Sequence, residues 1–451
     1  MGLPADLASI IYKLNERSSI AVNTPHGKTE RFQVKYVTKQ GTVWGPSLCC
    51  ASMGEIVDEI DGGAQIGTFT VPALAYVDDL NNPENNIRHV HKSHEKTMWF
   101  SEKKNQPLNK EKCTVLPINQ LPGGVVPTLM IEDHQLKTVD VMVYVGDDFN
   151  KNGNNNDLIE SRATKAMRCI RSCVAECGDV TLGQYVIQVL MIMYQSIFLQ
   201  TVLFNSGAWC NLTDTNMKRL KVIQMKYLKR VLHAPRSTPN VVVLRELGVL
   251  PIKAELHIRQ LSYLHNVLIL PSDDPVRMAY DQQKRFLFEQ SWYREIQGVL
   301  GLYELTTDEE TIRKMKKVTW KNLVKKKVTA QIVQQINNKC KGMSKMKYFP
   351  LYEKLQMQKY LRTMKPYDAR LFFRVKSNMI DLRAVCYYRY KDITCRLCLE
   401  SEETLHHVLN VCNRIAHHNT TIHLLDIHKE DGETSTQVIK RMKEFQKKVK
   451  E

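Results

Sequence analysis

The sequence lacks both hydrophobic signatures that would direct a chain to or across a membrane. Residues 1–21 contain neither a basic leading segment nor an unbroken apolar stretch, so no secretory signal is predicted. The longest apolar run, residues 185–204, is long enough to span a bilayer, but Gln188 and Gln195 interrupt it. We therefore expect a buried helix at 185–204, no membrane partner, and an intracellular protein, nuclear or cytoplasmic.

The chain also lacks the pattern of a disulfide-stabilised protein and any internal repeat at a fixed period. Its 12 cysteines are scattered irregularly over 451 residues. A chain of this length can form two or three domains with a sizeable core and needs no covalent cross-links. This cysteine usage predicts a reducing compartment, and the absence of a repeat excludes a solenoid.

Positive charge is present in excess, with a formal net charge of +17. Such a charge suits a polyanionic partner, because contacts with phosphates release counterions and so favour binding. The densest cationic stretch is residues 313–327, where lysines and arginines alternate with apolar residues such as Trp320 and Val324. This pattern predicts an amphipathic helix whose cationic face either contacts phosphates or is merely solvated.

Two adjacent carboxylates, Asp78 and Asp79, follow an apolar run at residues 71–75 that predicts a buried strand. Carboxylates at the tip of a buried strand are costly unless a cation compensates them. Two Mg²⁺ ions about 3.5–4 Å apart, held by carboxylates, serve in-line phosphoryl transfer in polymerases. A solvated turn is the alternative, because Asn, Asn and Pro follow at 81–83.

Other motifs flank this carboxylate pair in a definite order. Gln40 and Gly41 lie in a loop before it, and Lys112 and a segment from Tyr144 to Gly146 follow it. In this order and spacing the set resembles the reverse transcriptase of non-LTR retrotransposons. That family carries out RNA-directed DNA synthesis on an RNA and DNA template–primer, with deoxynucleoside triphosphates as substrates.

The resemblance also implies roles for single residues. Asp78 and Asp79 would hold the catalytic Mg²⁺ ions, and Lys112 would lie near the departing pyrophosphate. The remaining matches would contact template and incoming nucleotide (Gln40, Gly41, Tyr76) or form the primer grip (Tyr144, Gly146).

The family also carries a first metal-binding aspartate on a palm strand upstream of the Gln-Gly loop. Before Gln40 the only acidic residues are Asp6, Glu16 and Glu30, and none lies in an apolar strand context. We therefore expect a palm truncated before that aspartate and an incomplete two-metal site. Two functions stay open: a reverse transcriptase, or a catalytically inactive nucleic-acid-binding protein with a structural zinc site.

A second chemical signature lies near the C-terminus, at Cys395, Cys398, His407 and Cys412. Two thiolates, an imidazole and a third thiolate match a structural Zn²⁺ site with a tetrahedral shell. His406 competes with His407 as the ligand, and we favour His407 because it lies about one helical turn before Cys412. This pattern also resembles the zinc knuckle that follows the thumb in several non-LTR elements.

Just before this signature, residues 371–390 interleave basic and aromatic side chains. This is the composition of a surface that binds single strands, where rings stack on bases and cations follow phosphates. Aromatic residues at near-helical spacing equally well form a core. The sequence leaves the two interpretations open.

Taken in order, these segments predict an α+β chain. The expected parts are a partial reverse-transcriptase palm with an antiparallel sheet and helices (1–160), a helical thumb (161–270), a basic helical region (271–394), a CCHC zinc knuckle (395–412) and a lysine-rich tail (413–451). Within the tail, residues 430–451 are expected to form a solvated helix or a frayed end. Within the thumb, Gly248 followed by Pro251 predicts a helix end.

Overall fold

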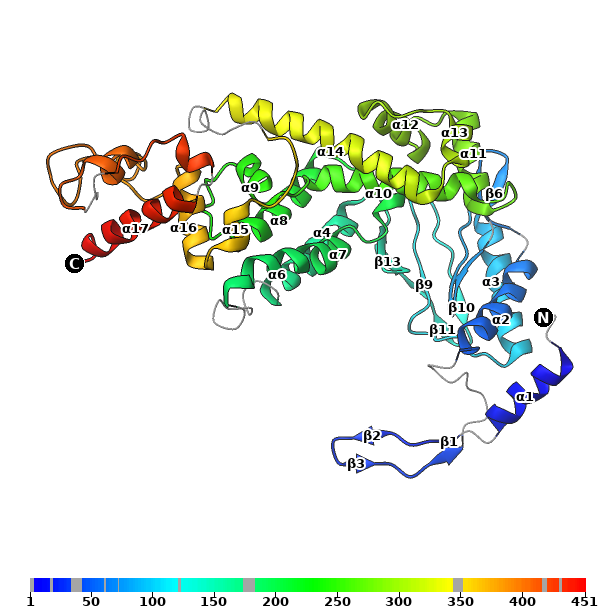
Figure 1. The fold of residues 1–451 in the computed structure, drawn as a ribbon. Helices are drawn as coiled ribbons and strands as arrows, with labels where there is room; N and C mark the ends of the chain where they lie inside the picture. The colour runs from blue at the N-terminus through cyan, green and yellow to red at the C-terminus, as the bar shows by residue number, and fades with distance from the viewer. Residues whose placement is uncertain are drawn as a thin grey trace. The chain divides into compact units, whose positions relative to one another are not determined.

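The computed structural model describes residues 4–16, 19–33, 43–60, 62–71, 73–120, 123–172, 183–343, 352–415, 420–429 and 432–451. Helices predominate, and every strand of these ranges lies between Ser19 and Asn150 (Figure 1). The chain divides into two compact units. The first unit is Met1–Asn154 with Asp281–Phe286, and the second is Asn155–Tyr280 with Leu287–Glu451. Mixed helix and strand content agrees with the α+β prediction.

The strands of the first unit pair only in twos within the described ranges, and all but one pair are antiparallel. The antiparallel pairs are β1 (Ser19–Ile20) with β4 (Phe32–Gln33), β2 (Asn23–Thr24) with β3 (Gly27–Lys28), β5 (Ala64–Ile66) with β6 (Phe69–Val71), β7 (Leu74–Tyr76) with β8 (Asp79–Asn81), β10 (Met130–Ile131) with β11 (His134–Gln135), and β13 (Val141–Tyr144) with β14 (Asp147–Asn150). The parallel pair is β9 (Thr114–Val115) with β12 (Lys137–Thr138).

Three helices accompany these strands: α1 (Ala5–Glu16), α2 (Gly45–Glu59) and α3 (Ile87–Lys104). The side chain of Asn86 caps the start of α3 by accepting a hydrogen bond from the backbone N–H of Arg88. The unit buries two small apolar clusters. One joins Ile56 of α2 to Phe100 of α3, and the other surrounds Ile131. Such small cores leave most of the hairpins facing solvent.

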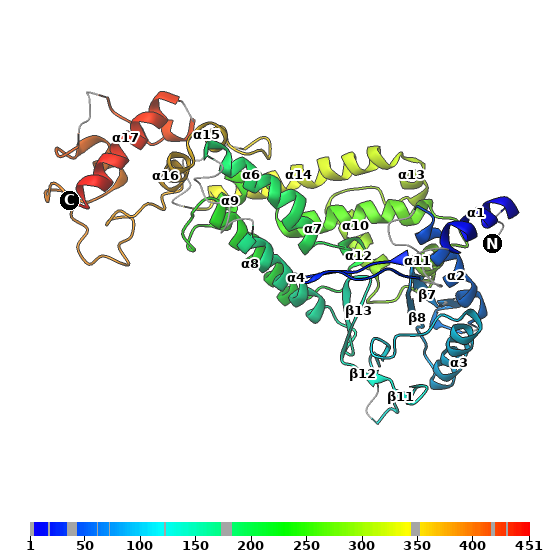
Figure 2. The ribbon, with the colours of Figure 1, turned by 90° about the horizontal axis from the view of Figure 1, so that it is seen from below.

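The second unit is built from helices around one large core. Its elements are α4 (Asn156–Ile170), η2 (Gly183–Tyr185), α6 (Val186–Met193), η3 (Tyr194–Phe198), α7 (Leu199–Val202), η4 (Ser206–Ala208), α8 (Asp214–Val231), α9 (Asn240–Leu247), α10 (Ile252–Ile269), α11 (Pro275–Phe286, which the two units share), α12 (Trp292–Leu302), α13 (Glu309–Lys314), α14 (Lys317–Lys341), α15 (Lys359–Thr363), α16 (Pro366–Lys376), η6 (His407–Val411), η7 (Asp426–Lys429) and α17 (Gly432–Lys448). Figure 2 shows α14 running beside α10, and α8 beside α4.

The long apolar run at 185–204 forms α6, η3 and α7 in succession, and much of it is buried, as predicted. Leu190 and Phe198 are fully buried, and Tyr194 stacks on Phe198 with ring centroids 5.4 Å apart. No helix in the described ranges is long and apolar enough to cross a membrane.

The helix end predicted at Gly248 is confirmed. α9 ends at Leu247, Gly248 adopts a left-handed conformation with φ of 66°, and α10 begins at Ile252. The backbone of Gln356 lies so close to Gly248 that an added Cβ would fall 2.1 Å from a backbone carbon. Both the conformation and this close approach require glycine.

The amphipathic helix predicted at 313–327 is confirmed, with one break, because α13 ends at Lys314 and α14 begins at Lys317. Trp320, Val324 and Val328 lie four residues apart and are fully buried on one face of α14. The indole of Trp320 donates a hydrogen bond to the backbone carbonyl of Leu261 in α10, at 2.8 Å. The lysines of this stretch are all exposed.

The solvated helix or frayed end predicted at residues 430–451 is a helix, α17, but the prediction that it is solvated is wrong for one of its faces. α17 buries Val438, Met442 and Phe445 in the large core, beside η6 and α16. The buried guanidinium of Arg441 donates hydrogen bonds to the carbonyls of Leu409, at 2.6 Å, and Thr420, at 2.7 Å. The prediction weighed the lysines of this segment and overlooked the apolar residues at helical spacing between them.

Candidate metal centre and the predicted polymerase motifs

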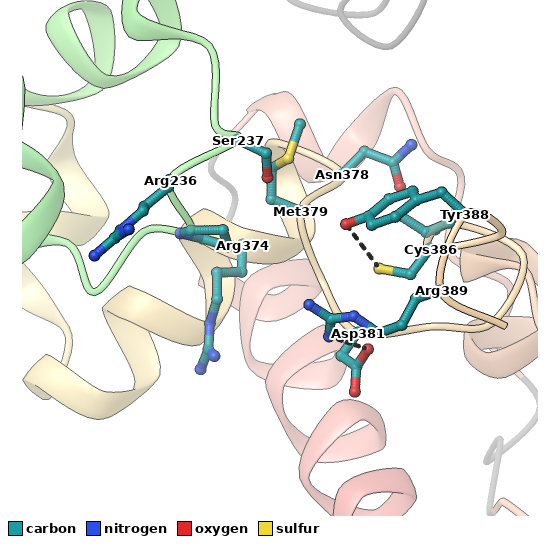
Figure 3. Close-up of a pocket in the computed structure, with 11 residues that line it drawn as sticks. Arg236, Ser237, Arg374, Asn378, Met379, Asp381, Cys386, Tyr388 and Arg389 are labelled. Carbon is teal, nitrogen blue, oxygen red and sulfur yellow. Dashed lines mark hydrogen bonds and ion pairs between the residues drawn. The ribbon is translucent and has the colours of Figure 1, made fainter.

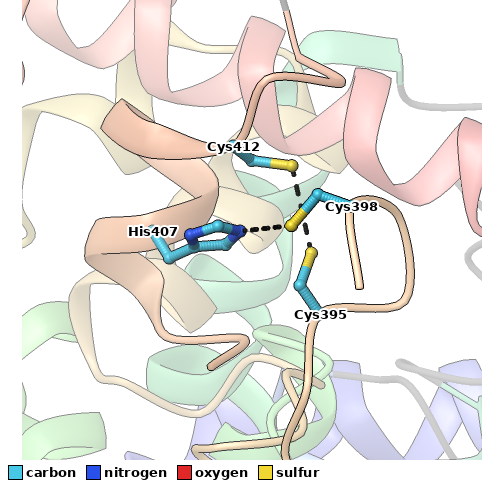
Figure 4. A group of neighbouring side chains, drawn as sticks. All are labelled: Cys395, Cys398, His407 and Cys412. Carbon is cyan, nitrogen blue, oxygen red and sulfur yellow. Dashed lines mark hydrogen bonds between the residues drawn. The ribbon is translucent and has the colours of Figure 1, made fainter. Parts of the chain in front are cut away.

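Four side chains that the sequence marked as metal ligands lie together in the second unit (Figure 4). The donor atoms of Cys395, Cys398, His407 and Cys412 all lie within 4.8 Å of one another. The Sγ atoms of Cys395 and Cys412 are 3.9 Å apart, and Cys398 Sγ lies 3.3 Å from His407 Nε2. A tetrahedral Zn²⁺ shell with ligand bonds of about 2.0–2.3 Å requires donor separations of roughly 3.3–3.8 Å. The group can hold a metal ion with little rearrangement.

A tight turn brings the first two cysteines to the same side. The backbone N–H of Cys395 donates to the carbonyl of Ser401 at 2.8 Å, and that of Leu399 donates back to Cys395 at 3.0 Å. Leu399 adopts a left-handed conformation with φ of 60°, which turns the chain directly after Cys398. The C-x2-C spacing therefore folds both thiols into one loop.

The third and fourth donors come from the two ends of one helical turn, η6. The backbone N–H of His407 donates to Thr404 Oγ1 at 3.1 Å, and that of Cys412 donates to the His407 carbonyl at 2.8 Å. His407 is buried, whereas its neighbour His406 is exposed and outside the group. Of the two histidines, the structure brings His407 to the three thiols.

A buried ion pair holds the loop that carries the cysteines. The carboxylate of Glu403 is completely buried and accepts hydrogen bonds from the backbone N–H and the guanidinium of Arg396. It also accepts one from the backbone N–H of Arg383 at 2.9 Å. The guanidinium of Arg396 in turn lies over the rings of Tyr390 and Phe445. This pair was not among the sequence predictions, although an acidic residue between two ligand positions is a visible signal.

The surroundings shift the thiol pKa values in opposite directions. Burial raises the pKa of the Cys412 thiol to about 12. Desolvation also acts on Cys398, but hydrogen bonds from the backbone of Glu400 and Ser401 and from the neighbouring thiols outweigh it and lower the pKa of Cys398. A metal ion would bind all three as thiolates.

With four protein donors, a bound ion would have no open position for substrate or water. Such closed shells are structural and not catalytic. Buried apolar residues that directly adjoin the donors, Val408, Leu409 and Ile415, belong to the large core of the second unit. The centre therefore connects the fold of residues 395–415 to that core.

The predicted Mg²⁺ ligands have a different setting. Asp78 and Asp79 lie at the tip of the β7–β8 hairpin, where Val77 takes a left-handed φ of 58°, and both carboxylates are exposed. The buried strand predicted before them is wrong, since all three residues of β7 are exposed. In the described ranges β7 pairs only with β8, and α2 packs beside it without burying any of its three residues. Among described residues, no third acidic, His or Cys side chain joins this pair in a metal-binding group.

The structure does bring the predicted primer-grip tyrosine to this hairpin. The hydroxyl of Tyr144 donates a hydrogen bond to the carbonyl of Leu74 in β7, at 3.2 Å. Burial, and secondarily the negative charge of Asp79, raise the pKa of Tyr144. Gly146 completes the β13–β14 turn with φ of 82°, a conformation that favours glycine. Two motifs separated by 70 residues of sequence are thus neighbours.

The other predicted residues have different settings. Lys112 is exposed in a turn and makes no ion pair with Asp78 or Asp79 in the described part of the chain. Tyr76 is exposed on β7. Gln40 and Gly41 lie outside the described residues.

No protein-family model matches this chain, and a search of curated proteins finds none that is similar.

Proposed function

We propose that this chain is a nucleic-acid-binding protein with a structural Zn²⁺ centre, derived from the reverse transcriptase of a non-LTR retrotransposon. The observation that carries the proposal is the cationic face of α13 and α14. Its members are all exposed: Arg313, Lys314, Lys316, Lys317, Lys321, Lys325, Lys326 and Lys327. Only the first two have an ion-pair partner in the described ranges, and both share Glu310.

The helix that carries these cations is firmly anchored. The buried seam of Trp320, Val324 and Val328 fixes α14 against the core, so its lysines project to solvent from a rigid helix. Fixed cations of one sign match the regular negative charge of a phosphate backbone, and counterion release makes that contact favourable. RNA and DNA are the partners that this chemistry fits.

The metal proposal rests on donor chemistry. Three thiolates and one imidazole favour Zn²⁺ over Mg²⁺ or Ca²⁺, which prefer oxygen ligands. Zn²⁺ would tie the Cys395–Cys398 loop to η6, a purely structural role. Elemental analysis of the purified protein tests this directly, with about one zinc per chain expected.

Salt dependence of binding tests the nucleic-acid proposal. Affinity for 20-nucleotide RNA and single-stranded DNA should fall steeply between about 50 and 200 mM salt. The combined variant Lys321→Gln, Lys325→Gln, Lys326→Gln should weaken binding and reduce the salt slope by about two to three. A matched control removes three exposed lysines of α8, Lys218, Lys221 and Lys226. Absent or salt-insensitive binding would refute the proposal.

RNA-directed DNA polymerase activity with Mg²⁺ is the second candidate function. The hydrogen bond between Tyr144 and Leu74 supports it, because the family resemblance assigns primer grip and metal-binding hairpin to one active site. Primer extension on an RNA template with deoxynucleoside triphosphates and Mg²⁺ tests this candidate. Extension that disappears in Asp78→Asn with Asp79→Asn would support it, and no extension by the unaltered chain would exclude it.

A further inference from the structure

A pocket of about 450 Å³ opens in the second unit, between the loop that joins α8 to α9 and the segment that follows α16 (Figure 3). Arg236 and Ser237 line it from the first loop. Arg374, in the last turn of α16, and the residues that follow it line the rest. Its volume is in the range of sites that enclose a small ligand or one unit of a polymer.

Positive charge dominates this lining, with three arginines, Arg236, Arg374 and Arg389, and one acidic residue, Asp381. Asp381 is already engaged, because it pairs with Arg389 at 3.5 Å and accepts a hydrogen bond from Tyr390 at 3.1 Å. The Nε atom of Arg374 is buried, and no described residue accepts a hydrogen bond from it. An anion in the pocket can pair with the guanidinium groups of the lining arginines.

The pocket also carries an exposed aromatic ring. Tyr388 is 67 % exposed, and Figure 3 shows it between Asn378 and Arg389 on the segment after α16. This resolves the basic and aromatic stretch at 371–390 into two parts. Phe372 and Phe373 belong to the core, whereas Tyr387 and Tyr388 project to solvent. Exposed rings beside arginines are the features with which proteins hold single-stranded nucleic acids.

We propose that this pocket binds one nucleotide of a single-stranded nucleic acid. Arg236 and Arg374 contact the phosphate, and the ring of Tyr388 stacks on the base. The inference rests on the proposed nucleic-acid function and adds a base-contacting site, separate from α13 and α14, to it. Stacking on a tyrosine is possible with any base, so the site has little sequence preference.

The loop that forms the pocket is tied to the candidate metal centre. The carboxylate of Glu403 accepts a hydrogen bond from the backbone N–H of Arg383. The guanidinium of Arg396 donates a hydrogen bond to the backbone carbonyl of Asp381, at 2.9 Å. Arg383 itself donates to the carbonyl of Thr394, which directly precedes Cys395. A metal ion that orders the loop at Cys395 would therefore also order the residues around Tyr388.

The experiment measures binding of the full chain to fluorescent U12 and dT12 at a fixed salt concentration. Tyr388→Ala should weaken binding at least about tenfold, the loss of one base–aromatic stack, whereas Tyr388→Phe keeps the ring and should bind normally. The double variant Arg236→Gln, Arg374→Gln should weaken binding more than its control, Arg168→Gln with Arg171→Gln, two exposed arginines around the end of α4.

The outcomes separate this inference from the proposed function. If the unaltered chain binds neither oligonucleotide, the proposed function fails and the pocket inference fails with it. If the chain binds but Tyr388→Ala and the double variant bind normally, only the pocket inference is overturned. A poly-glutamate peptide of equal charge that competes fully with U12 would show a general anion surface, and would also overturn it.

Discussion

The two places where the sequence points to metal ions, Asp78–Asp79 in the first unit and the Cys/His group in the second, differ in what surrounds them. The aspartates lie at the tip of a two-stranded hairpin, and both carboxylates face solvent. The thiols and imidazole lie against a continuous apolar core, and a buried ion pair holds their loop. The four metal-binding side chains of the second unit therefore lie close together because core packing fixes the backbone segments that carry them.

The largest expected effect is the loss of the metal centre. Cys412→Ser should reduce bound zinc from about one per chain to almost none and unfold residues 395–451, because structural zinc can supply about 10 kcal/mol of folding free energy in small modules. Zinc content and protease sensitivity measure this. The control, Cys50→Ser, changes an exposed cysteine of the first unit. Unchanged zinc content in Cys412→Ser would remove Cys412 from the ligand set.

A smaller effect comes from breaking a buried ion pair of the second unit. Lys376 and Glu246 lie 3.0 Å apart and are almost fully buried, and the hydroxyl of Tyr360 also donates to Glu246. Lys376→Met removes the nearer of the two cations that pair with this buried carboxylate and leaves only Arg245, at 4.0 Å, so it should cost about 3 kcal/mol of unfolding free energy.

An exposed ion pair of the first unit provides the matched comparison. Lys151 and Asp140 lie 2.9 Å apart with both side chains at least half exposed. Lys151→Met should cost no more than about 1 kcal/mol. Denaturant titrations of both variants give the two values, and equal losses would contradict the contrast between the units.

The pH dependence of stability provides a third test. Burial, and secondarily the charge of Lys253, lower the pKa of His257 to about 4, and the ring hydrogen-bonds the hydroxyl of Tyr303. The unfolded chain binds a proton near pH 6.5, so stability is full above that pH and falls as the pH drops toward 4. The loss of unfolding free energy between pH 7 and 4 should be about 3 kcal/mol, and it should be smaller in His257→Gln. Thermal unfolding from pH 7 to 4 measures it, and an equal loss in His257→Gln would rule out this histidine.

The smallest effect is expected at the exposed carboxylates. Asp78→Asn with Asp79→Asn should change the unfolding free energy by no more than about 0.5 kcal/mol, because neither carboxylate is buried. The same result is expected with and without Mg²⁺ if the pair does not hold the ion. Stabilisation of the unaltered chain by millimolar Mg²⁺ that the double variant loses would reverse the comparison and indicate a metal site at the hairpin.

Local spacing predicted those parts of the fold in which one helix or one loop contains the whole pattern. The apolar repeat at Trp320 and Val324, the helix end at Gly248 and the ligand spacing from Cys395 to Cys412 are of this kind. Each depends on residues close in sequence, for which backbone geometry determines the neighbours.

It was harder to predict burial for segments that are buried only if another helix or strand packs over them. The apolar run before Asp78 has the composition of a buried strand, yet a short run does not show whether another element will cover it. The opposite error was made for α17. Its many lysines suggested a solvated segment, but the apolar residues between them form a face that packs into the core. The stretch at 371–390 was ambiguous until the structure separated buried Phe372 from exposed Tyr388.

The net positive charge, the amphipathic pattern at residues 313–327 and the types of ligand at the candidate metal centre follow from the sequence alone. Tertiary packing confirms the preference for His407 over His406. It alone brings Tyr144 to the Asp78–Asp79 hairpin and places three arginines and Tyr388 around one pocket. The physical reason is that charge and periodicity are properties of a segment. Burial and convergence arise when segments distant in sequence pack together and exclude water from some side chains while leaving others exposed.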